Sequence, residues 1–369
     1  MKTKAAVIGD VGKDWEVIEL DLDRPKESEV LVRFAAAGLC LTDEHMRTGD
    51  LPVQCPVVAG HEGAGIVAEV GAAVTRVRPG DHVVCSFRPV CGQCRFCARG
   101  ASNLCDMGQV LPRTAMIDGT FRFHRERDFG QAFRLGTFSQ WAVVSELSCI
   151  KIDSDLPLET AVLAGCAVPA GWGTAVNAGG VRPGDTTVVY GTGGTGINAV
   201  QGAVYAGAAH VIGVDPVASK REAAVRFGAT HTASDASAAQ QIITELTQGI
   251  GADQALVTVG TVTEEILSAA FTAIRRGGTM VVTGIAAPGR NTIQLSGFDL
   301  TTMEKRVVGS VFGSGNPLVI IPQLLDLYRS GQLKLDEQIT ARYRLEDIAQ
   351  GYRDMADGQN LRGIIVHEH

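Results

Sequence analysis

A glycine-rich turn, GTGGTG, limits the folds open to this chain more than any other segment. It follows the apolar run 186–190 and opens a helical stretch, and its glycines are Gly191, Gly193, Gly194 and Gly196. Glycines at such a turn let the backbone approach a pyrophosphate, which then lies at the N-terminus of the helix. The pattern alone is weak, but a strand before it and a helix after it are the context that the mechanism requires. The segment therefore predicts a dinucleotide-binding unit.

An acidic residue closes the next predicted strand. Asp215 ends the run His210–Asp215 and lies 24 residues after Gly191. A carboxylate there accepts hydrogen bonds from the adenosine ribose hydroxyls and repels a 2′-phosphate, which favours NAD over NADP. The alternative is a turn residue at a strand end before Pro216.

Strand and helix patterns alternate around this turn. Apolar runs at 186–190, 210–215, 254–259 and 278–284 are separated by helical stretches such as 198–205 and 219–227. This alternation predicts a parallel sheet with helices on both faces. The first 150 or so residues differ, because short apolar runs are cut by Gly, Pro and Asp, which is typical of β-strands and turns. The final segment, 363–369, also has the pattern of a strand.

Four cysteines form the most specific motif. Cys91, Cys94, Cys97 and Cys105 have the spacing C-x2-C-x2-C-x7-C. Four thiolates brought together by short turns predict a closed tetrahedral zinc site, with an iron–sulfur cluster or coincidence as the alternatives.

A second set of ligand types is scattered along the chain. Cys40, the dipeptide His61-Glu62, and Cys166 each have a plain explanation as buried core residues. Together, Cys40, His61 and Cys166 could supply two thiolates and one imidazole with one open position, which suits a catalytic zinc.

Composition and charge indicate which kinds of binding partner and which cellular location to expect. The net charge of -7 is spread over the chain and no basic stripe is present, which argues against nucleic acid and anionic membranes as partners. The N-terminus has no long apolar run, and no stretch of about 18 apolar residues occurs, so neither a secretory signal nor a transmembrane helix is expected. Clustered cysteines in such a chain more often bind metal than form disulfides. We therefore expect a cytoplasmic protein.

In combination, these motifs resemble the zinc-dependent medium-chain alcohol dehydrogenases. The segments at 60–71, 118–123 and 135–141 fall in the family order together with the cysteine and glycine motifs. The resemblance implies an α/β architecture, in which a Rossmann domain with a doubly wound parallel sheet is inserted into a GroES-like β-rich catalytic domain. It places the catalytic domain at 1–167, with a structural zinc lobe at 91–105, the NAD-binding domain at 168–311, and the return to the catalytic domain at 312–369. Family members associate through the Rossmann domain, so a homo-oligomer, a dimer or a tetramer, is expected.

The resemblance also implies a reaction and its metal ligands. The reaction interconverts a small alcohol and an aldehyde or ketone by hydride transfer with NAD(H). Two zinc ions per subunit are implied, a catalytic one on Cys40, His61 and Cys166 and a structural one on the four-cysteine lobe. Zinc lowers the pKa of a bound alcohol by several units.

Roles for the remaining site residues follow from the same resemblance. Thr42 would take the proton from the alcohol, and His45 would pass it to solvent. Asp43 would orient His61, and Glu62 would lie behind the metal. At the cofactor, Lys220 would support Asp215 at the ribose and Arg362 would pair with the pyrophosphate.

A narrower resemblance is to the actinobacterial nicotinoprotein subgroup. It rests on the segments AAGLCLTDEH, RTGDLP, SFRPVCGQC, KIDSDLPLE and YGTGGTGINAVQGA. Members of this subgroup retain NAD(H) through turnover and are reoxidised by an external acceptor such as a nitrosoaniline dye.

Three positions depart from the wider family. Leu41 replaces a common basic residue that faces the pyrophosphate, and Ala170 replaces a Thr that packs on the nicotinamide. Gln109 replaces an Arg of the thiol-adduct formaldehyde dehydrogenases, which weakens that alternative function. An alternative of another class is a non-catalytic NAD-binding or structural relative, which the presence of Cys40, His61 and Cys166 argues against.

Overall fold

The computed structural model describes residues 1–108, 111–285 and 292–369. The chain divides into two compact units, of which one contains Met1–Cys166 and Asn316–His369 and the other contains Ala167–Gly315. The C-terminal segment belongs to the first unit because its last strand, β18 (Arg362–Val366), pairs with β3 (Glu29–Gly38). Gln109, which bears on the formaldehyde alternative, lies outside the described residues.

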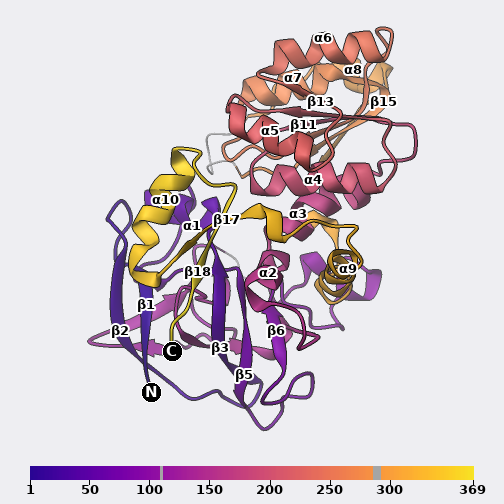
Figure 1. Ribbon diagram of the computed structural model, residues 1–369. Coiled ribbons are helices and arrows are strands. Elements are labelled where there is room, and N and C mark those ends of the chain that lie inside the picture. The colour runs from indigo at the N-terminus through magenta and orange to yellow at the C-terminus, as the bar shows by residue number, and fades with distance from the viewer. Residues whose placement is uncertain (109–110, 286–291) are drawn as a thin grey trace. The chain divides into compact units, whose positions relative to one another are not determined.

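Two sheets build the first unit (Figure 1). The smaller sheet is a closed barrel in the order β1-β2-β7-β8-β4, with strands β1 (Lys2–Ile8), β2 (Glu16–Leu22), β4 (Val57–Val58), β7 (Phe123–His124) and β8 (Asp128–Gln131). The larger sheet has the order β10-β6-β5-β3-β18-β17, with β9 paired to β3. Its strands are β3, β5 (Gly63–Val70), β6 (His82–Cys85), β9 (Trp141–Ser145), β10 (Cys149–Ile152), β17 (Ile339–Tyr343) and β18. Apolar side chains of both sheets, such as Val7, Leu20, Val32 and Phe34, form one buried core.

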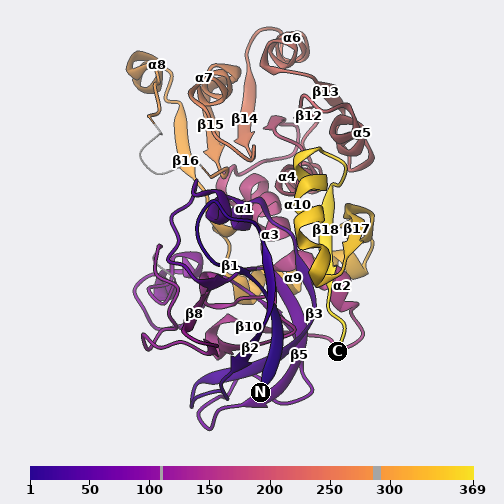
Figure 2. The ribbon, with the colours of Figure 1, turned by 90° about the vertical axis from the view of Figure 1, so that its left-hand side faces the viewer.

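Four helices accompany these sheets. They are α1 (Leu41–Thr48), α2 (Leu158–Ala161), α9 (Pro317–Arg329) and α10 (Ile348–Ala356). Helix α10 packs against β17 and β18, and Figure 2 shows all three in yellow beside each other. Two residues separate the end of β3 from helix α1, and Cys40 is the residue that precedes the first turn of the helix.

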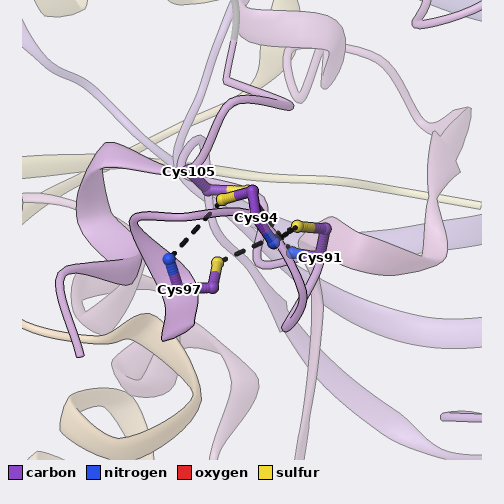
Figure 3. A group of neighbouring side chains, drawn as sticks. All are labelled: Cys91, Cys94, Cys97 and Cys105. Carbon is purple, nitrogen blue, oxygen red and sulfur yellow. Dashed lines mark hydrogen bonds between the residues drawn. The ribbon is translucent and has the colours of Figure 1, made fainter. Parts of the chain in front are cut away.

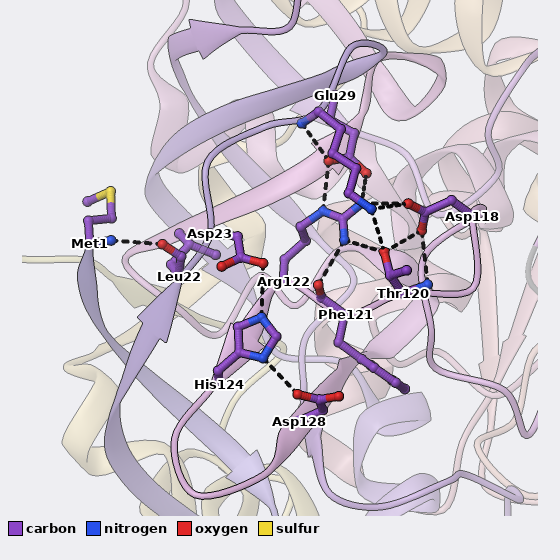
Figure 4. A network of polar contacts seen from close by, with 11 residues as sticks. Met1, Leu22, Asp23, Glu29, Asp118, Thr120, Phe121, Arg122, His124 and Asp128 are labelled. Atoms are coloured by element: carbon purple, nitrogen blue, oxygen red, sulfur yellow. Dashed lines mark hydrogen bonds and ion pairs between the residues drawn. The ribbon is translucent and has the colours of Figure 1, made fainter.

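A buried arginine, Arg122, links the segment before β7 to the start of β3 (Figure 4). The Arg122 guanidinium donates to both carboxylate oxygens of Glu29, at 2.8 and 2.6 Å, and to Asp118 at 3.0 Å. Arg122 is only 1% exposed, so its buried charge depends on the two carboxylates of Glu29 and Asp118 for compensation. Nearby, the His124 ring lies between Asp23 and Asp128, at 3.0 and 2.8 Å. These contacts tie β7 to the strand β2 and to the start of β3.

The second unit is an α/β layer with one parallel sheet. Its order is β13-β12-β11-β14-β15-β16, and every neighbouring pair is parallel. The strands are β11 (Thr186–Tyr190), β12 (His210–Val214), β13 (His231–Ala233), β14 (Ala252–Val257), β15 (Ile274–Val282) and β16 (Arg306–Gly309). The chain progresses outward from β11 in one direction and then from β14 in the other, which is the doubly wound Rossmann order. The predicted fold class is confirmed.

Helices cover both faces of this sheet (Figure 1). They are α3 (Ala167–Gly173), α4 (Gly194–Tyr205), α5 (Ala218–Arg226), α6 (Ala236–Leu246), α7 (Glu264–Ala273) and α8 (Gly297–Thr302). Helices α6 and α7 contact each other over β13, β14 and β15, whereas α3 and α4 pack together on the opposite face. The predicted start of the first helix at Asn198 is wrong, because α4 begins one turn earlier, at Gly194. The predicted strand 278–284 likewise begins earlier, at Ile274.

No single helix among the described residues is both long and apolar enough to cross a membrane, although the bent pair Leu158–Gly165 and Ala167–Ala178 passes on length and composition alone.

Candidate metal centres and nucleotide-binding turn

The four cysteines of the motif converge on one point (Figure 3). The Sγ atoms of Cys91 and Cys97 are 3.9 Å apart, and those of Cys94 and Cys105 are 4.0 Å apart. A regular tetrahedron with zinc–sulfur bonds of about 2.3 Å has edges of about 3.8 Å. The sulfur positions therefore fit a single tetrahedral ion, and they are closer together than a multi-iron cluster would require.

Short turns position these sulfurs. A 3-10 turn spans Cys97–Arg99 and a second spans Ser102–Leu104. Backbone N–H groups point at the sulfurs, with Cys94 N 3.3 Å from Cys91 Sγ and Cys97 N 3.5 Å from Cys94 Sγ. Hydrogen bonds from the N–H groups of Asp106 and Cys97 lower the pKa of Cys94 to about 6, which favours the thiolate that a metal binds.

Replacing Cys97 with serine is expected to remove the metal of the four-cysteine lobe and to lower the thermal stability of the protein. The separate cluster of Cys40, His61 and Cys166 should keep its metal. The lobe has few buried apolar residues, so metal binding supplies its folding energy. A loss of about 2 kcal/mol would lower the melting temperature by roughly 4–8 °C in a domain of this size. Calorimetry and metal analysis check this, with Cys55→Ser, at a half-buried cysteine outside both clusters, as the control. A variant that melts like the wild type and keeps both metals would overturn the interpretation of the lobe.

A second ligand cluster brings together residues that are far apart in sequence. Ligand atoms of Cys40, His61, Glu62 and Cys166 all lie within 4.8 Å of one another. Cys40 lies between β3 and α1, the His61-Glu62 pair precedes β5, and Cys166 follows a 3-10 turn over Val162–Gly165. The donor set of two sulfurs and one imidazole is the one that zinc prefers at an open site. Among the described residues, these two clusters are the groups that could hold a metal ion.

Local backbone geometry aims His61 into this cluster. Gly60 has φ +90, and a Cβ atom there would lie 2.5 Å from the backbone nitrogen of Phe138. Only glycine therefore fits before His61. The Gly60 N–H donates to Asp43 Oδ1 at 2.9 Å, and Asp43 Oδ2 lies 2.8 Å from His61 Nδ1. With Nδ1 facing a carboxylate, Nε2 is left for the ligand cluster.

Charges in the cluster are buried and interdependent. Burial opposes the charged ring, but the charges of Asp43 and Cys40 raise the pKa of His61 well above its usual value. Burial raises the pKa of Glu62 to about 7, against the opposing effect of the Arg362 charge. Glu62 Oε1 is buried and has no hydrogen-bond partner in the described structure. An unsatisfied carboxylate oxygen beside two sulfurs fits a site that holds a cation.

Arg362 lies next to this cluster. Its Nη2 hydrogen-bonds to Glu62 Oε2, and the residue is only 5% exposed. The family resemblance implied a role for Arg362 at the pyrophosphate, and the sequence gave no sign of its contact with Glu62, 300 residues away in the chain. The role at the pyrophosphate stays a prediction.

The predicted proton-relay residues share one face of α1. Thr42 Oγ1 is 3.5 Å from Cys40 Sγ, and His45 lies one turn further along the helix. The ring of His45 is 3.4 Å from Asp50 and is 12% exposed. Thr42 thus lies beside the ligand cluster, with His45 as its helical neighbour.

The glycine-rich turn follows β11 at the carboxyl end of the sheet. A Cβ at Gly196 would lie 1.8 Å from the carbonyl oxygen of Gly191, so the turn requires glycine there. A Cβ at Gly193 would meet nothing within 4 Å, and no side chain caps the N-terminus of α4. The turn therefore leaves open space in front of a helix N-terminus, which fits a pyrophosphate.

Asp215 directly follows β12, which ends at Val214, and it is held by backbone contacts. Its carboxylate accepts from Thr192 N and Val217 N, both at 3.0 Å. The guanidinium of Arg221 donates to the backbone carbonyl of Asp215 at 2.8 Å. Lys220, predicted to support Asp215, accepts a hydrogen bond from Thr192 through its backbone carbonyl at 3.3 Å. Its role at the ribose stays a prediction.

Sequence reasoning missed three aromatic residues beside the second cluster. The rings of Phe87 and Phe133 lie 5.4 and 5.1 Å from the His61 ring. The Tyr352 hydroxyl donates to the backbone carbonyl of Cys40 at 3.2 Å. No local pattern could have found Phe133 or Tyr352, because each contact joins segments that are distant in sequence.

Comparisons with known proteins agree with this geometry. Residues 26–154 match the family model of the alcohol dehydrogenase GroES-like domain, and residues 194–329 match that of zinc-binding dehydrogenases. The chain belongs to the zinc-dependent medium-chain alcohol dehydrogenases, and it is a zinc-binding dehydrogenase with two candidate metal sites.

Two relatives that match over the full length are also named as alcohol dehydrogenases. A Mycobacterium tuberculosis protein named "Putative alcohol dehydrogenase D" is 58% identical over 368 residues, with 100% of both chains covered. The NDMA-dependent alcohol dehydrogenase of Amycolatopsis methanolica is 56% identical, with 100% of this chain and 99% of the other covered. Among solved structures, benzyl alcohol dehydrogenase from Acinetobacter calcoaceticus has a TM-score of 0.92 at 33% identity, with both chains fully covered.

Proposed function

We propose that this alcohol dehydrogenase oxidises alcohols at the cluster of Cys40, His61 and Cys166, using NAD(H) that it retains through turnover. The observation that carries the proposal is the convergence of these three ligands around one buried point, with Asp43 behind His61. A zinc ion held there would lower the pKa of a bound alcohol, and NAD at the glycine-rich turn would accept the hydride. The four-cysteine lobe would hold a second, structural zinc.

The chain's own residues would handle the proton. The Thr42 hydroxyl lies beside Cys40 Sγ and can accept the alcohol proton while donating its own onward. His45, on the same face of α1, would carry the proton toward solvent. Asp43 would keep the Nδ1–H tautomer of His61 through their contact at 2.8 Å. Glu62 and Arg362 would form a buried pair behind the metal.

Retention of the cofactor is supported by one relative. The protein of Amycolatopsis methanolica, 56% identical, is named as NDMA-dependent, which matches the nicotinoprotein resemblance of the sequence. An external acceptor would then reoxidise the cofactor in place. A panel of alcohols, each assayed with and without a nitrosoaniline dye, tests the proposal directly. Dye-dependent turnover of alcohols supports it, and the absence of any alcohol turnover in metal-loaded protein would refute it.

Selectivity for NAD is expected to be at least tenfold over NADP, or about 1.4 kcal/mol. The buried carboxylate of Asp215 would repel a 2′-phosphate if the ribose binds beside it, and Arg221 is engaged by the carbonyls of Asp215 and Pro216 at 2.8 Å each. Titration of cofactor-free protein with each nucleotide measures the ratio, and Asp215→Asn should reduce it. Equal affinity of the wild type for both nucleotides would contradict the role of Asp215.

A homo-oligomer is part of the proposal. Strand β16 is the last strand of its sheet, and edge strands pair readily with another chain. The segment before it exposes apolar side chains, with Phe298 73%, Ile293 49% and Leu300 40% exposed. Exposed apolar groups of this kind mark protein contacts. Light scattering distinguishes a dimer or tetramer from a monomer.

One other function on the same scaffold is an alternative. A thiol-adduct formaldehyde dehydrogenase would oxidise formaldehyde only when a cofactor thiol is added.

A further inference from the structure

An aromatic pair borders the candidate catalytic centre on its partly exposed side. The Phe87 and Phe133 rings lie 5.3 Å from each other, and each contacts the His61 ring. Both are half-buried, whereas His61 is only 1% exposed. An alcohol at the open position of the cluster would therefore meet these rings with its carbon chain.

Phe133 reaches this position through an unusual backbone. Phe133 has φ 50 and Arg134 has φ 60, so two consecutive bulky residues adopt the left-handed conformation. Side chains rarely tolerate this region, and such residues persist only where the surroundings hold them.

Arg134 supplies the contacts that hold this turn. Its Nη1 donates to the carbonyl of Met107 at 2.7 Å, and its Nε donates to the carbonyl of Ala115 at 3.1 Å. Met107 is two positions after Cys105, the last ligand of the four-cysteine lobe. From the other side, the Gln131 amide donates to the carbonyls of Leu135 and Val143 at 3.1 and 3.0 Å. The turn is thus fixed to the end of the lobe as well as to the barrel.

We propose that Arg134 is a positioning residue for the alcohol. It holds the Phe133 ring against His61, and through Met107 it makes that position depend on the folded four-cysteine lobe. The inference rests on the proposed function, because it assumes that the alcohol binds at Cys40, His61 and Cys166. It predicts a preference for alcohols whose own ring can pack on Phe133, since aromatic pairs add binding energy beyond their buried area.

Kinetics with benzyl alcohol and ethanol test this inference. Phe133→Leu and Arg134→Gln should each raise KM for benzyl alcohol by roughly tenfold, equivalent to about 1.4 kcal/mol. The kcat for benzyl alcohol and the KM for ethanol should stay within about twofold, because the metal ligands are untouched. The double variant should resemble either single variant, since both changes remove the same ring contact. Arg134→Lys, which keeps one donor, should restore part of the benzyl alcohol affinity.

A matched control separates positioning from general loosening of the lobe. Arg76 donates to the carbonyl of Val90 at 2.7 Å, next to Cys91 at the other end of the lobe, so Arg76→Lys should leave the benzyl alcohol to ethanol ratio unchanged. The zinc content and melting temperature of every variant are measured alongside. Additive effects in the double variant, or an equal change of the ratio in Arg76→Lys, would overturn the inference.

Binding of an unreactive aromatic amide, benzamide, gives a second readout by calorimetry. The affinity should fall in Phe133→Leu and Arg134→Gln, even in a preparation that does not turn over. Wild-type protein that oxidises no alcohol would refute the proposed function. Unchanged benzamide affinity in both variants of an active enzyme would refute this inference alone.

Discussion

A Cys166→Ala variant is expected to lose one of two zinc ions and nearly all turnover while remaining folded. Cys166 is 9% exposed, and its sulfur is grouped with Cys40 and His61 in the second cluster. Two remaining ligands are too few to hold a catalytic zinc at an open site. Loss of a partner outside the ligand set commonly costs 10–100-fold in activity or metal affinity, so loss of a ligand should cost at least about 100-fold.

Metal analysis, circular dichroism and turnover on the same preparation measure this effect. Cys149→Ala is the matched control, because Cys149 is also buried but lies in β10, outside both clusters. The control should keep both metals and its activity. Full activity in a folded Cys166→Ala protein would show that Cys166 is not a ligand.

A second large effect is expected when the artificial acceptor is withheld. If NAD leaves much more slowly than the enzyme turns over, reduced cofactor cannot be replaced from solution. Alcohol oxidation should then stop after about one turnover per subunit, even with excess NAD, and a nitrosoaniline dye should restart it. The purified protein should carry nearly stoichiometric NAD(H) that is released only by denaturation.

The opposing expectation is an ordinary dehydrogenase that exchanges its cofactor. Leu41 permits that outcome, because the family resemblance implies a basic residue facing the pyrophosphate at this position, and leucine cannot make that contact. Sustained NADH formation by protein purified without bound nucleotide would show that the nicotinoprotein assignment is wrong. That result would leave the zinc dehydrogenase assignment intact.

Features carried by local spacing were predictable from the sequence. The four-cysteine lobe closes within fifteen residues through short turns, so its spacing alone indicated the tetrahedral arrangement. The alternation of strands and helices around Gly191 indicated the parallel sheet, and the strand order confirms it. The errors in the predicted starts of α4 and β15 both occur next to glycines. The helix pattern missed Gly194–Gly196 and the strand pattern missed residues before Gly277-Gly278, because glycine disfavours both structures locally.

Features that depend on distant contacts were not predictable. Arg362 meets Glu62 across 300 positions, and Phe133 reaches His61 only through a left-handed turn held by Arg134. A propensity pattern favours ordinary backbone at Phe133 and Arg134, and the tertiary hydrogen bonds from Arg134 override it. The convergence of Cys40, His61 and Cys166 could be named from the family resemblance, but their proximity required the folded sheet.

The most direct test of the account is the zinc content of the purified wild-type chain, measured on the preparation that is assayed for alcohol oxidation with a nitrosoaniline dye. The account predicts two zinc ions per subunit, one for each cluster, together with dye-dependent oxidation of alcohols. Removal of the zinc ion at Cys40, His61 and Cys166 with a chelator should abolish turnover, and added zinc should restore it. A folded protein that holds one zinc per subunit, or none, and still oxidises alcohols at full rate would contradict the account.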